Sequence, residues 1–315
     1  MIDKKNLRIV FFGTPDFAVA SLKTILENHF NVVGVVTAPD KPAGRGYELQ
    51  QSAVKKFASE QGLTILQPVN LKSDDFNKAL SDLKADLQIV IAFRMLPEKV
   101  WSSPRLGTFN LHASYLPNYR GAAPINWAII NGETSTGITT FFLKHEIDTG
   151  SILLQESTPI LPTDNVGTLH DKLMHQGAQL VVKSLELILT ETYALKEQIV
   201  GDFKHASKIF TEHCLINWSQ SAEQVHNLVR GLSPFPTAFA IVKGKKLKIF
   251  ETEITDLKAY QVGQVEIIDK ALLISCSDKK LKLLSIQPEG KKRMPVADFL
   301  NGFRITEPTI AQSVL

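Results

Sequence analysis

An asparagine, a histidine and an aspartate offer the side chains that an acyl-transfer site needs. Asn110 and His112 lie two residues apart within the segment 107–127, and Asp148 opens the turn Asp148-Thr149-Gly150. An amide donates a hydrogen bond at any working pH, and an imidazole exchanges a proton near neutrality. A carboxylate can hold the imidazole in one tautomer and favour its charged form. These three residue types could therefore stabilise an oxyanion and move a proton.

The asparagine–histidine pair is expected at the carboxyl end of a strand. Thr108–Leu111 reads as a short strand, in which alternate side chains share one face. Pro117 and Gly121 interrupt that strand, and Pro124 suits the first turn of a helix. Ligands of open α/β sheets bind beyond the carboxyl ends of the strands. Taken alone, either residue would more often be an ordinary loop residue, so the inference depends on the trio.

The first 150 residues alternate between patterns typical of strands and of helices. Buried strands are expected at 7–12, 32–36 and 87–92, and helices at 17–27 and 52–61. This alternation favours an α/β fold with a doubly wound, mostly parallel sheet. The turn after the first strand reads G-T-P-D-F and lacks the glycines of a dinucleotide site, so no dinucleotide is expected.

The pattern changes in the second half of the chain. A long helix is expected at 166–190, a polar linker at 191–207 and a further helix at 219–231. Five short strands are then expected, at 239–242, 247–250, 263–267, 272–275 and 281–284. Short strands around turns favour a small barrel of the OB type. We therefore expect a catalytic domain at 1–190, the linker at 191–207 and an OB-like domain at 208–315.

Composition indicates an ordinary globular protein. The 315 residues are 44% hydrophobic and 21% charged, and no run of about 18 apolar residues indicates a transmembrane helix. Cys214 and Cys276 are the only cysteines, and the chain shows no metal-ligand spacing, so neither a disulfide framework nor a metal site is expected. The start lacks a signal-peptide pattern, which favours the cytoplasm. A monomer is expected.

Charge is distributed unevenly along the chain. The formal net charge is +3, with a net of +4 from residue 208 onward and a net of −1 before it. A basic excess in the last third is consistent with a weak electrostatic footprint for nucleic acid. A solvated barrel surface explains the same excess equally well.

Several motifs carry a resemblance to a known family. The block N-L-H-A-S-Y-L-P-N-Y-R-G-A-A-P-I at 110–125 and the later D-T-G resemble folate-dependent formyltransferases. The segments F-F-G-T-P-D-F-A-V at 11–19 and T-A-P-D-K-P-A-G-R-G-Y-E-L at 37–49 resemble the branch of that family that formylates methionyl-tRNA. The similarity continues with I-N-W-S at 216–219, R-G-L-S-P-F-P-T-A at 230–238 and Q-P-E-G-K-K at 287–292. It thus covers nearly the whole chain.

The resemblance implies roles for particular residues. It assigns catalysis to Asn110, His112 and Asp148, with 10-formyltetrahydrofolate as the co-substrate and no metal. The residues that it places along the folate are Arg94, Leu96, Ser114, Tyr115, Leu116 and Pro117. The segment around Arg94 departs from the family, because V-I-A-F-R-M-L-P is one residue shorter than usual and has arginine where glycine is expected.

The resemblance also implies a nucleic-acid partner. The residues that it places against initiator methionyl-tRNA are Lys41, Arg45 and Lys208, the first two on the basic loop 40–46. The implied function is formylation of that tRNA for translation initiation. One alternative is an enzyme of the same family with another amine as acceptor, such as an amino sugar nucleotide. Another is a non-catalytic tRNA-binding protein, which would not need the trio.

Overall fold

The computed structural model describes residues 3–43, 48–305 and 308–312. The chain forms two compact units. The first comprises Met1–Gly121, Gly137–Thr158 and His170–His205, and the second comprises Ala122–Thr136, Pro159–Leu169 and Ala206–Leu315. The units are built from interleaved segments, and the continuous domains expected from the sequence stay a prediction.

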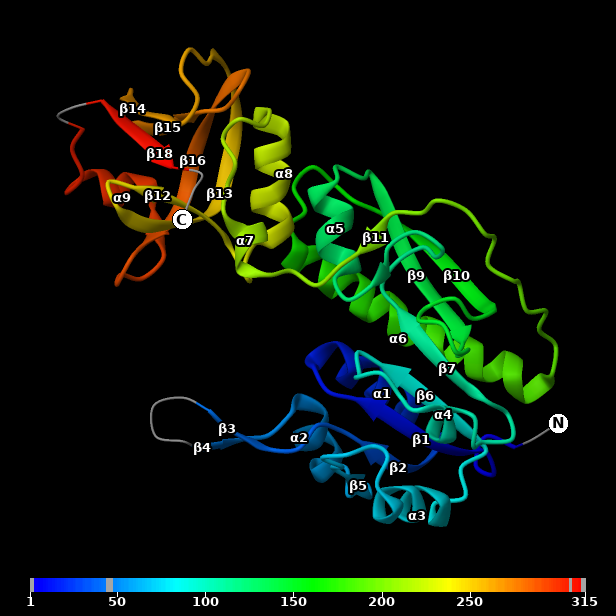
Figure 1. Cartoon of the computed structure of the whole chain (residues 1–315). Helices are drawn as coiled ribbons and strands as arrows, with labels where there is room; N and C mark the ends of the chain where they lie inside the picture. Colours follow the sequence, from blue (N-terminus) through cyan, green and yellow to red (C-terminus); the bar gives the residue numbers. More distant parts are fainter. Residues whose placement is uncertain (1–2, 44–47, 306–307, 313–315) are drawn as a thin grey trace. The chain divides into compact units, whose positions relative to one another are not determined.

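A seven-stranded sheet forms the centre of the first unit (Figure 1). In spatial order its strands are β10 (Ile152–Pro159), β9 (Ser135–Phe142), β7 (Thr108–His112), β6 (Leu87–Ile91), β1 (Arg8–Gly13), β2 (Asn31–Val36) and β5 (Ile65–Leu66). The five strands from β7 to β5 are parallel, and β9 runs antiparallel to β7. The predicted α/β fold with a mostly parallel sheet is confirmed.

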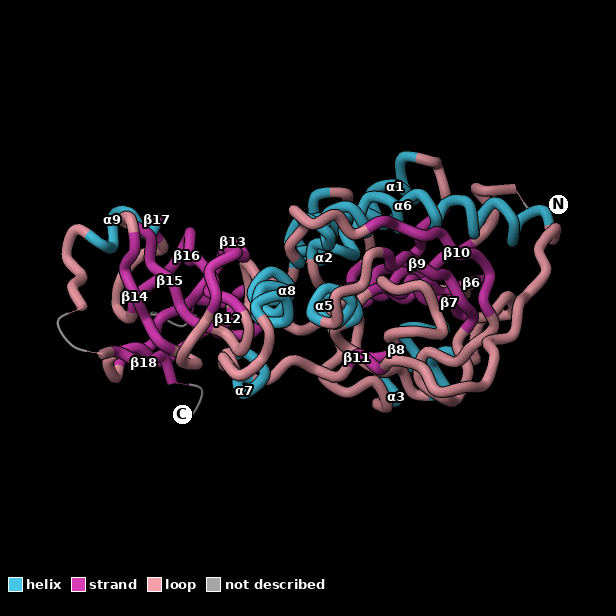
Figure 2. Tube along the Cα trace, turned by 90° about the horizontal axis from the view of Figure 1, so that it is seen from above, coloured by secondary structure: helices cyan, strands magenta, loops and turns pink. Residues whose placement is uncertain are grey.

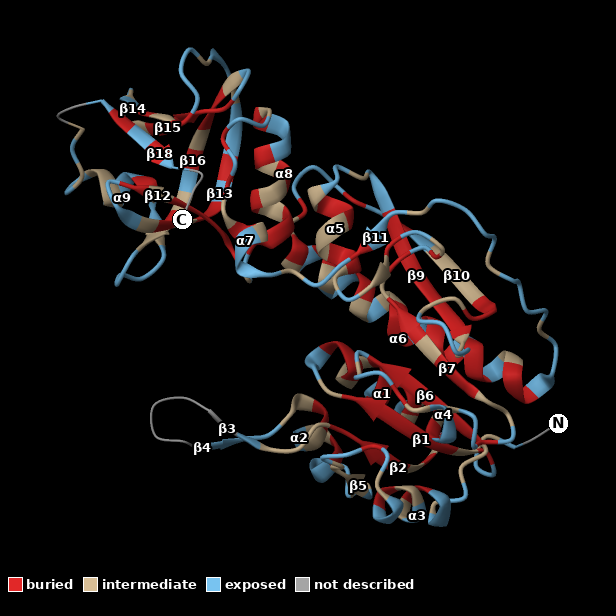
Figure 3. Ribbon diagram, viewed as in Figure 1, coloured by how far each residue is buried: buried red, intermediate tan, exposed pale blue. Residues whose placement is uncertain are grey.

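Helices cover both faces of this sheet, as a sheet of continuous apolar strands requires. They are α1 (Asp16–Glu27), α2 (Ala53–Glu60), α3 (Asp74–Asp82), α4 (Glu98–Trp101) and α6 (Val166–Thr190). Side chains of α3 and α4 join the core cluster that contains Val10, Phe12 and Val90. In Figure 2, α1 and α6 lie on one side of the sheet and α3 lies on the other. Figure 3 shows the strands between these layers as largely buried.

Short elements complete the first unit. They are the hairpin of β3 (Lys41–Ala43) and β4 (Glu48–Gln50) and the two-residue strand β8 (Arg120–Gly121). The short strand β11 (His205–Ala206), at the end of the segment expected to be a linker, lies where the first unit ends and the second resumes. The ion pair of Asp40 with Lys55 stands at the base of the hairpin. Gln67 Nε2 also donates to Asp40 Oδ1 at 2.8 Å. The hydrogen bonds from Lys55 and Gln67 lower the pKa of Asp40.

The second unit contains a closed antiparallel barrel of six strands. Around the ring they are β13 (Lys245–Lys258), β12 (Ala238–Val242), β18 (Thr309–Gln312), β14 (Gln264–Ile268), β15 (Ala271–Ser275) and β16 (Lys279–Pro288). Pairing of β13 with β16 closes the ring, and β17 (Met294–Pro295) pairs with β16 outside it. The expected barrel is confirmed. The expected count of five strands lacks β18, which lies far along the chain beyond α9 (Val296–Leu300).

Three more helices belong to the second unit: α5 (Pro124–Ile130), α7 (Thr211–Cys214) and α8 (Ala222–Leu232). Ser221 caps α8 and forms a capping box with Gln224, as Ser and Gln three residues apart favour. The buried face of α8 packs on the barrel through Val225 and Val229, in one cluster with the fully buried Trp218. This unit thus has its own apolar core.

Candidate active site

Strand β7 carries Asn110 and His112 on the face opposite to α6. Leu111 packs against that helix, since a Cβ added to Gly177 of α6 would lie 2.7 Å from Leu111 Cδ2. The neighbouring Thr140 of β9 also faces α6, where its hydroxyl bonds to Ser184. Asn110 is half-buried and His112 is 7% exposed. The alternation expected from the sequence therefore directs the pair away from the core and toward the site.

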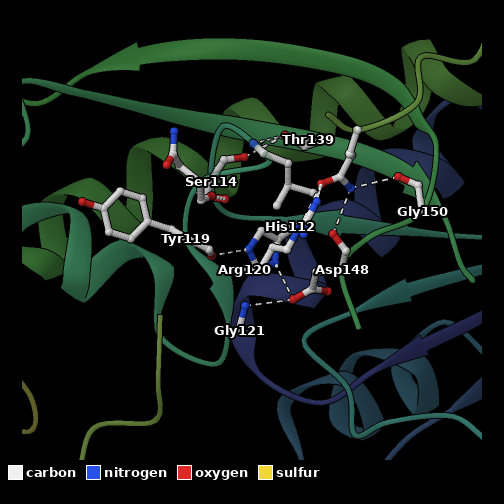
Figure 4. A network of polar contacts seen from close by, with 11 residues as sticks. His112, Ser114, Tyr119, Arg120, Gly121, Thr139, Asp148 and Gly150 are labelled. Carbon is white, nitrogen blue, oxygen red and sulfur yellow. Dashed lines mark hydrogen bonds and ion pairs between the residues drawn. The ribbon is translucent and has the colours of Figure 1, made fainter. Parts of the chain in front are cut away.

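The imidazole of His112 is held through one nitrogen. Its Nε2 lies 2.9 Å from the carbonyl oxygen of Tyr119 (Figure 4). A carbonyl only accepts, so Nε2 carries the proton and donates it, which leaves Nδ1 as the nitrogen available for chemistry. Tyr119 has a φ of 62°, in the left-handed region that side chains rarely adopt. We expected Asp148 to hold this tautomer; in the structure His112 donates its hydrogen bond to the Tyr119 carbonyl, and Asp148 lies 3.9 Å from Nδ1.

Asp148 lies beside the free nitrogen of His112. Its Oδ2 is 3.9 Å from His112 Nδ1, and both side chains are nearly buried. The same Oδ2 accepts a hydrogen bond of 2.9 Å from the amide of Gly121 (Figure 4). Asp148 has a φ of 56°, a conformation that aspartate tolerates better than most residues. Asp148 thus stands beside His112 Nδ1 without forming a direct hydrogen bond to it.

Gly150 fixes how closely the Asp148 turn approaches the sheet. A Cβ at this position would lie 1.6 Å from the carbonyl oxygen of Phe142, the last residue of β9. Only glycine fits there. Because Asp148 is two residues away, this contact sets the position of its carboxylate.

Asn110 presents an amide that is free for a ligand. In the part of the chain that the structure describes, its side chain has no hydrogen-bond partner, although it is half-buried. The amide lies two residues before His112 on the same face, and its role toward a bound molecule stays a prediction.

The loop expected to lie along the folate is held by hydrogen bonds to the strands β9 and β10 and by one bond of its own. Thr139 of β9 donates to the Ser114 carbonyl at 2.7 Å and accepts from the Leu116 amide at 3.2 Å. The Ser114 hydroxyl donates to the carbonyl of Asn118, and Gln155 donates to that of Leu116. The Ser114 and Leu116 side chains are buried. Pro117 is half-buried and Tyr115 is 47% exposed, so these two offer side-chain surface to a ligand.

The segment around Arg94 is tied to a neighbouring loop. The Arg94 guanidinium donates to the carbonyl oxygens of Pro68 and Val69 and lies 5.8 Å from the Phe93 ring. Leu96 is 8% exposed and packs in the core. Arg94 therefore acts structurally in the conformation seen here, and contact of Arg94 and Leu96 with folate stays a prediction.

The residues expected to contact tRNA fall in both units. Lys41 is exposed at the start of β3, and Arg45 lies outside the described residues. Lys208 is exposed in the second unit, where its ammonium lies 5.4 Å from the centre of the Phe210 ring. Their contact with tRNA stays a prediction.

Several residues that hold the site had no signal in the sequence. The Tyr119 carbonyl and the Gly121 amide act through the backbone, which no residue pattern reveals. Gln198 binds the Asp148 turn from within the segment expected to be a linker. Within the described ranges, no group of three or more His, Cys, Asp or Glu could hold a metal ion, and no helix is long and apolar enough to cross a membrane.

Similarity to known proteins is extensive. Residues 7–185 match the formyl transferase family, and residues 208–304 match the C-terminal domain of formyl transferases. Methionyl-tRNA formyltransferase of Bacteroides thetaiotaomicron is 51% identical, over 96% of this chain and 98% of its own length. The enzyme of that name from Flavobacterium johnsoniae is 48% identical, with the same two coverages.

Solved structures of other proteins share the fold of this chain. The sugar 3N-formyl transferase WlaRD superimposes with a TM-score of 0.68 at 22% identity, over 91% of this chain and 99% of that one. HypX from Aquifex aeolicus in complex with tetrahydrofolic acid gives a TM-score of 0.64 at 17% identity, over 97% of this chain and 51% of that one. The chain belongs to the formyl transferase family.

Proposed function

We propose that this chain transfers a formyl group from 10-formyltetrahydrofolate to the α-amino group of methionine on initiator tRNA, for translation initiation. The observation that carries the proposal is the identity of about half, over nearly the full length, with methionyl-tRNA formyltransferases. The geometry around His112 is consistent with it, because the structure supplies a proton carrier, a carboxylate and a free amide in one region.

The first step of the proposed reaction is attack of the neutral amine on the formyl carbon. A C–N bond forms and the formyl oxygen becomes an oxyanion, which needs a hydrogen-bond donor. The unpartnered amide of Asn110 is suited to that task and keeps its donors at any working pH. A missing oxyanion donor typically slows such reactions by ~10²–10³-fold.

The second step moves a proton and releases the folate. The attacking amine loses a proton, the bond between the formyl carbon and folate N10 breaks, and N10 gains a proton. His112 Nδ1 is suited to carry this proton, because Nε2 is occupied by the Tyr119 carbonyl. The Asp148 carboxylate at 3.9 Å stabilises the transient imidazolium. Formyl transfer by these groups is balanced and consumes no further reactant.

The two alternative functions make different demands. A sugar acceptor has support from the fold of WlaRD, but a likeness at 22% identity shows the fold alone. A non-catalytic tRNA-binding protein would not need a buried His112 facing a carboxylate. Because charged initiator tRNA is made in the cytoplasm, the proposed reaction takes place there. A trio supplied by one chain suits a monomer.

An assay with matched acceptors tests the proposal. The protein is incubated with 10-formyltetrahydrofolate and either methionyl initiator tRNA, methionyl elongator tRNA or an amino sugar nucleotide. We expect formyl transfer to the initiator tRNA and at least ~10²-fold lower kcat/KM with the other two. Faster reaction with the sugar would support the first alternative, and binding of tRNA without transfer would support the second.

Arg45 is proposed to contact the tRNA. Its planar guanidinium can bind phosphate through two hydrogen bonds or stack on a base. Arg45→Ala should therefore raise KM for charged tRNA by roughly tenfold, the effect of losing one such contact, and leave folate binding nearly intact. Lys78→Ala, at an exposed lysine on α3, is the control. Equal losses for both ligands would show that Arg45 supports the fold instead.

A further inference from the structure

Three consecutive residues outside the recognised motifs hold the turn that carries Asp148. The backbone of Lys196 exchanges two hydrogen bonds with Ile152, at 2.8 and 2.9 Å. The carboxylate of Glu197 accepts from Ser151 Oγ at 2.6 Å and from Lys144 Nζ at 2.7 Å. Gln198 completes the set. We call residues 196–198 the clamp segment.

Gln198 uses both ends of its amide. Its Nε2 donates to the carbonyl oxygens of Asp148 and Gly150, each at 2.9 Å. Its Oε1 accepts from Arg120, at 3.1 Å from Nε and 2.6 Å from Nη2. Only an amide side chain of this length both donates two hydrogen bonds and accepts two.

Arg120 connects this amide to the other half of the site. The residue before it supplies the carbonyl that fixes His112 Nε2, and the residue after it, Gly121, donates to the Asp148 carboxylate. Figure 4 shows Arg120 between Tyr119 and Gly121, next to Asp148. Gln198 thus joins the segment 119–121, which orients the imidazole, to the turn that carries the carboxylate.

We propose that Gln198 is a positioning residue for the formyl transfer proposed above, on which the inference rests. Its hydrogen bonds fix the position of the Asp148 turn relative to the segment 119–121, so that the Asp148 carboxylate lies beside His112 Nδ1. Small misplacements of catalytic groups reduce turnover strongly. Neither substrate is expected to touch Gln198, so its loss should lower kcat and leave both KM values nearly unchanged.

Gln198→Glu is the sharpest single test. Glutamate keeps the acceptor for Arg120 but places a carboxylate oxygen against the carbonyls of Asp148 and Gly150. We expect kcat to fall roughly tenfold or more, with both KM values within about threefold. Ile199→Ala, an exposed neighbour, is the matched control and should retain wild-type rates. Wild-type kcat in Gln198→Glu, or an equal fall in the control, would overturn the proposal.

A double-mutant cycle separates positioning from general stability. In an Asp148→Asn background the carboxylate is already lost, so Gln198→Glu should reduce kcat by less than about twofold further. A purely structural role predicts that the two losses multiply. Multiplication of the losses would therefore contradict the proposal.

Hydrogen exchange supplies a test that does not depend on activity. Gln198→Ala should speed exchange of the Gly121 amide, which donates to Asp148, by at least ~10-fold. The amide of Val35, which donates to the Thr64 carbonyl near the opposite edge of the sheet, should exchange as in the wild type. Unchanged exchange at Gly121 would overturn the positioning role. A wild-type protein without formyl transfer would overturn the proposed function and leave this measurement valid.

Discussion

The two loops that meet at the candidate site are held in different ways. The loop 113–117, after His112, is held by neutral groups: its own serine and carbonyls, and Thr139 and Gln155 of the strands beside it. The loop 143–151, which carries Asp148, is held by the clamp segment about 50 residues later. The ionised carboxylate of Glu197 accepts two of the hydrogen bonds between them. The first loop is therefore determined by its strands, whereas the second depends on a distant segment.

This difference explains why the first loop is easier to predict from the sequence than the second. The block 110–125 contains Asn110, His112 and the serine that shapes their loop, and the other supports of this loop lie in the adjacent strands β9 and β10. The turn at 148–150 contains the acting carboxylate alone, and its supports lie in a polar stretch without periodicity. A loop built from distant supports should also be the one that mutations and acid disturb first.

The largest effect is expected from removing the imidazole on which both loops converge. His112→Ala should lower turnover at least ~10²-fold, the usual scale for losing a proton-transfer group. Asn110→Ala should have a loss of similar size through the oxyanion. His145→Ala, at an exposed histidine of the second loop, is the control and should change turnover little. Steady-state kinetics with saturating folate would measure this, and near-wild-type turnover in His112→Ala would refute the shared site.

Gly150→Ala tests the second loop by steric means. The added Cβ would meet the Phe142 carbonyl oxygen at 1.6 Å, so the Asp148 turn must move. We expect unfolding free energy to fall by roughly 1–3 kcal/mol, the usual cost of overpacking, together with a marked loss of kcat. Gly302→Ala, where nothing lies within 4 Å of the added Cβ, is the control. Denaturant titration and kinetics measure the two effects, and equal stability of both variants would contradict the steric account.

Thr139→Val tests the first loop with an isosteric change. The hydroxyl joins Ser114 to Leu116, and its loss leaves a buried carbonyl and a buried amide short of a partner. The expected cost is about 1–2 kcal/mol of unfolding free energy, within the range for unsatisfied buried groups. Thr140→Val, on the opposite face, loses one bond to Ser184 and leaves the loop alone. We expect kcat to fall in Thr139→Val and not in Thr140→Val, and the reverse result would contradict the assignment of faces.

The sequence predicted those features that depend on apolar periodicity and on local breakers. Continuous apolar runs located β1, β2 and β6, and Pro124 located the start of α5, because these signals lie within the element that they form. Residue alternation placed Asn110 and His112 on one face of β7.

Features set by distant partners could not be predicted in this way. β18 contains four residues and is held by β12 and β14, which precede it by many positions. Gln198 is an ordinary polar residue until the fold brings Asp148 and Arg120 to it. The tautomer of His112 depends on a backbone carbonyl, which every residue possesses.

The smallest expected effect is the loss of stability at low pH, which should differ between the two loops because only the second is held by an ionised side chain. Hydrogen bonds from Lys144 and Ser151 lower the pKa of Glu197 below its usual 4.5. A carboxyl with a depressed pKa in the folded state stabilises that state above pH 4.5, and the contribution is lost as pH falls through the folded value. Acidification below pH 4.5 should therefore loosen the second loop before the first, whose hydrogen-bonding groups are neutral.

Hydrogen exchange at two amides measures this difference. Ile152, whose amide donates to Lys196, should lose protection between pH 4.5 and 3 relative to Leu116, whose amide donates to Thr139. The change should be modest, within about threefold, because an exposed ion pair contributes little. In Glu197→Gln the side chain no longer titrates, so the ratio of the two protections should become independent of pH over this range. If the ratio of protections in that variant still falls with acid as steeply as in the wild type, another group titrates. The contrast between a loop held by neutral groups and a loop held partly by an ionised carboxylate would then be wrong.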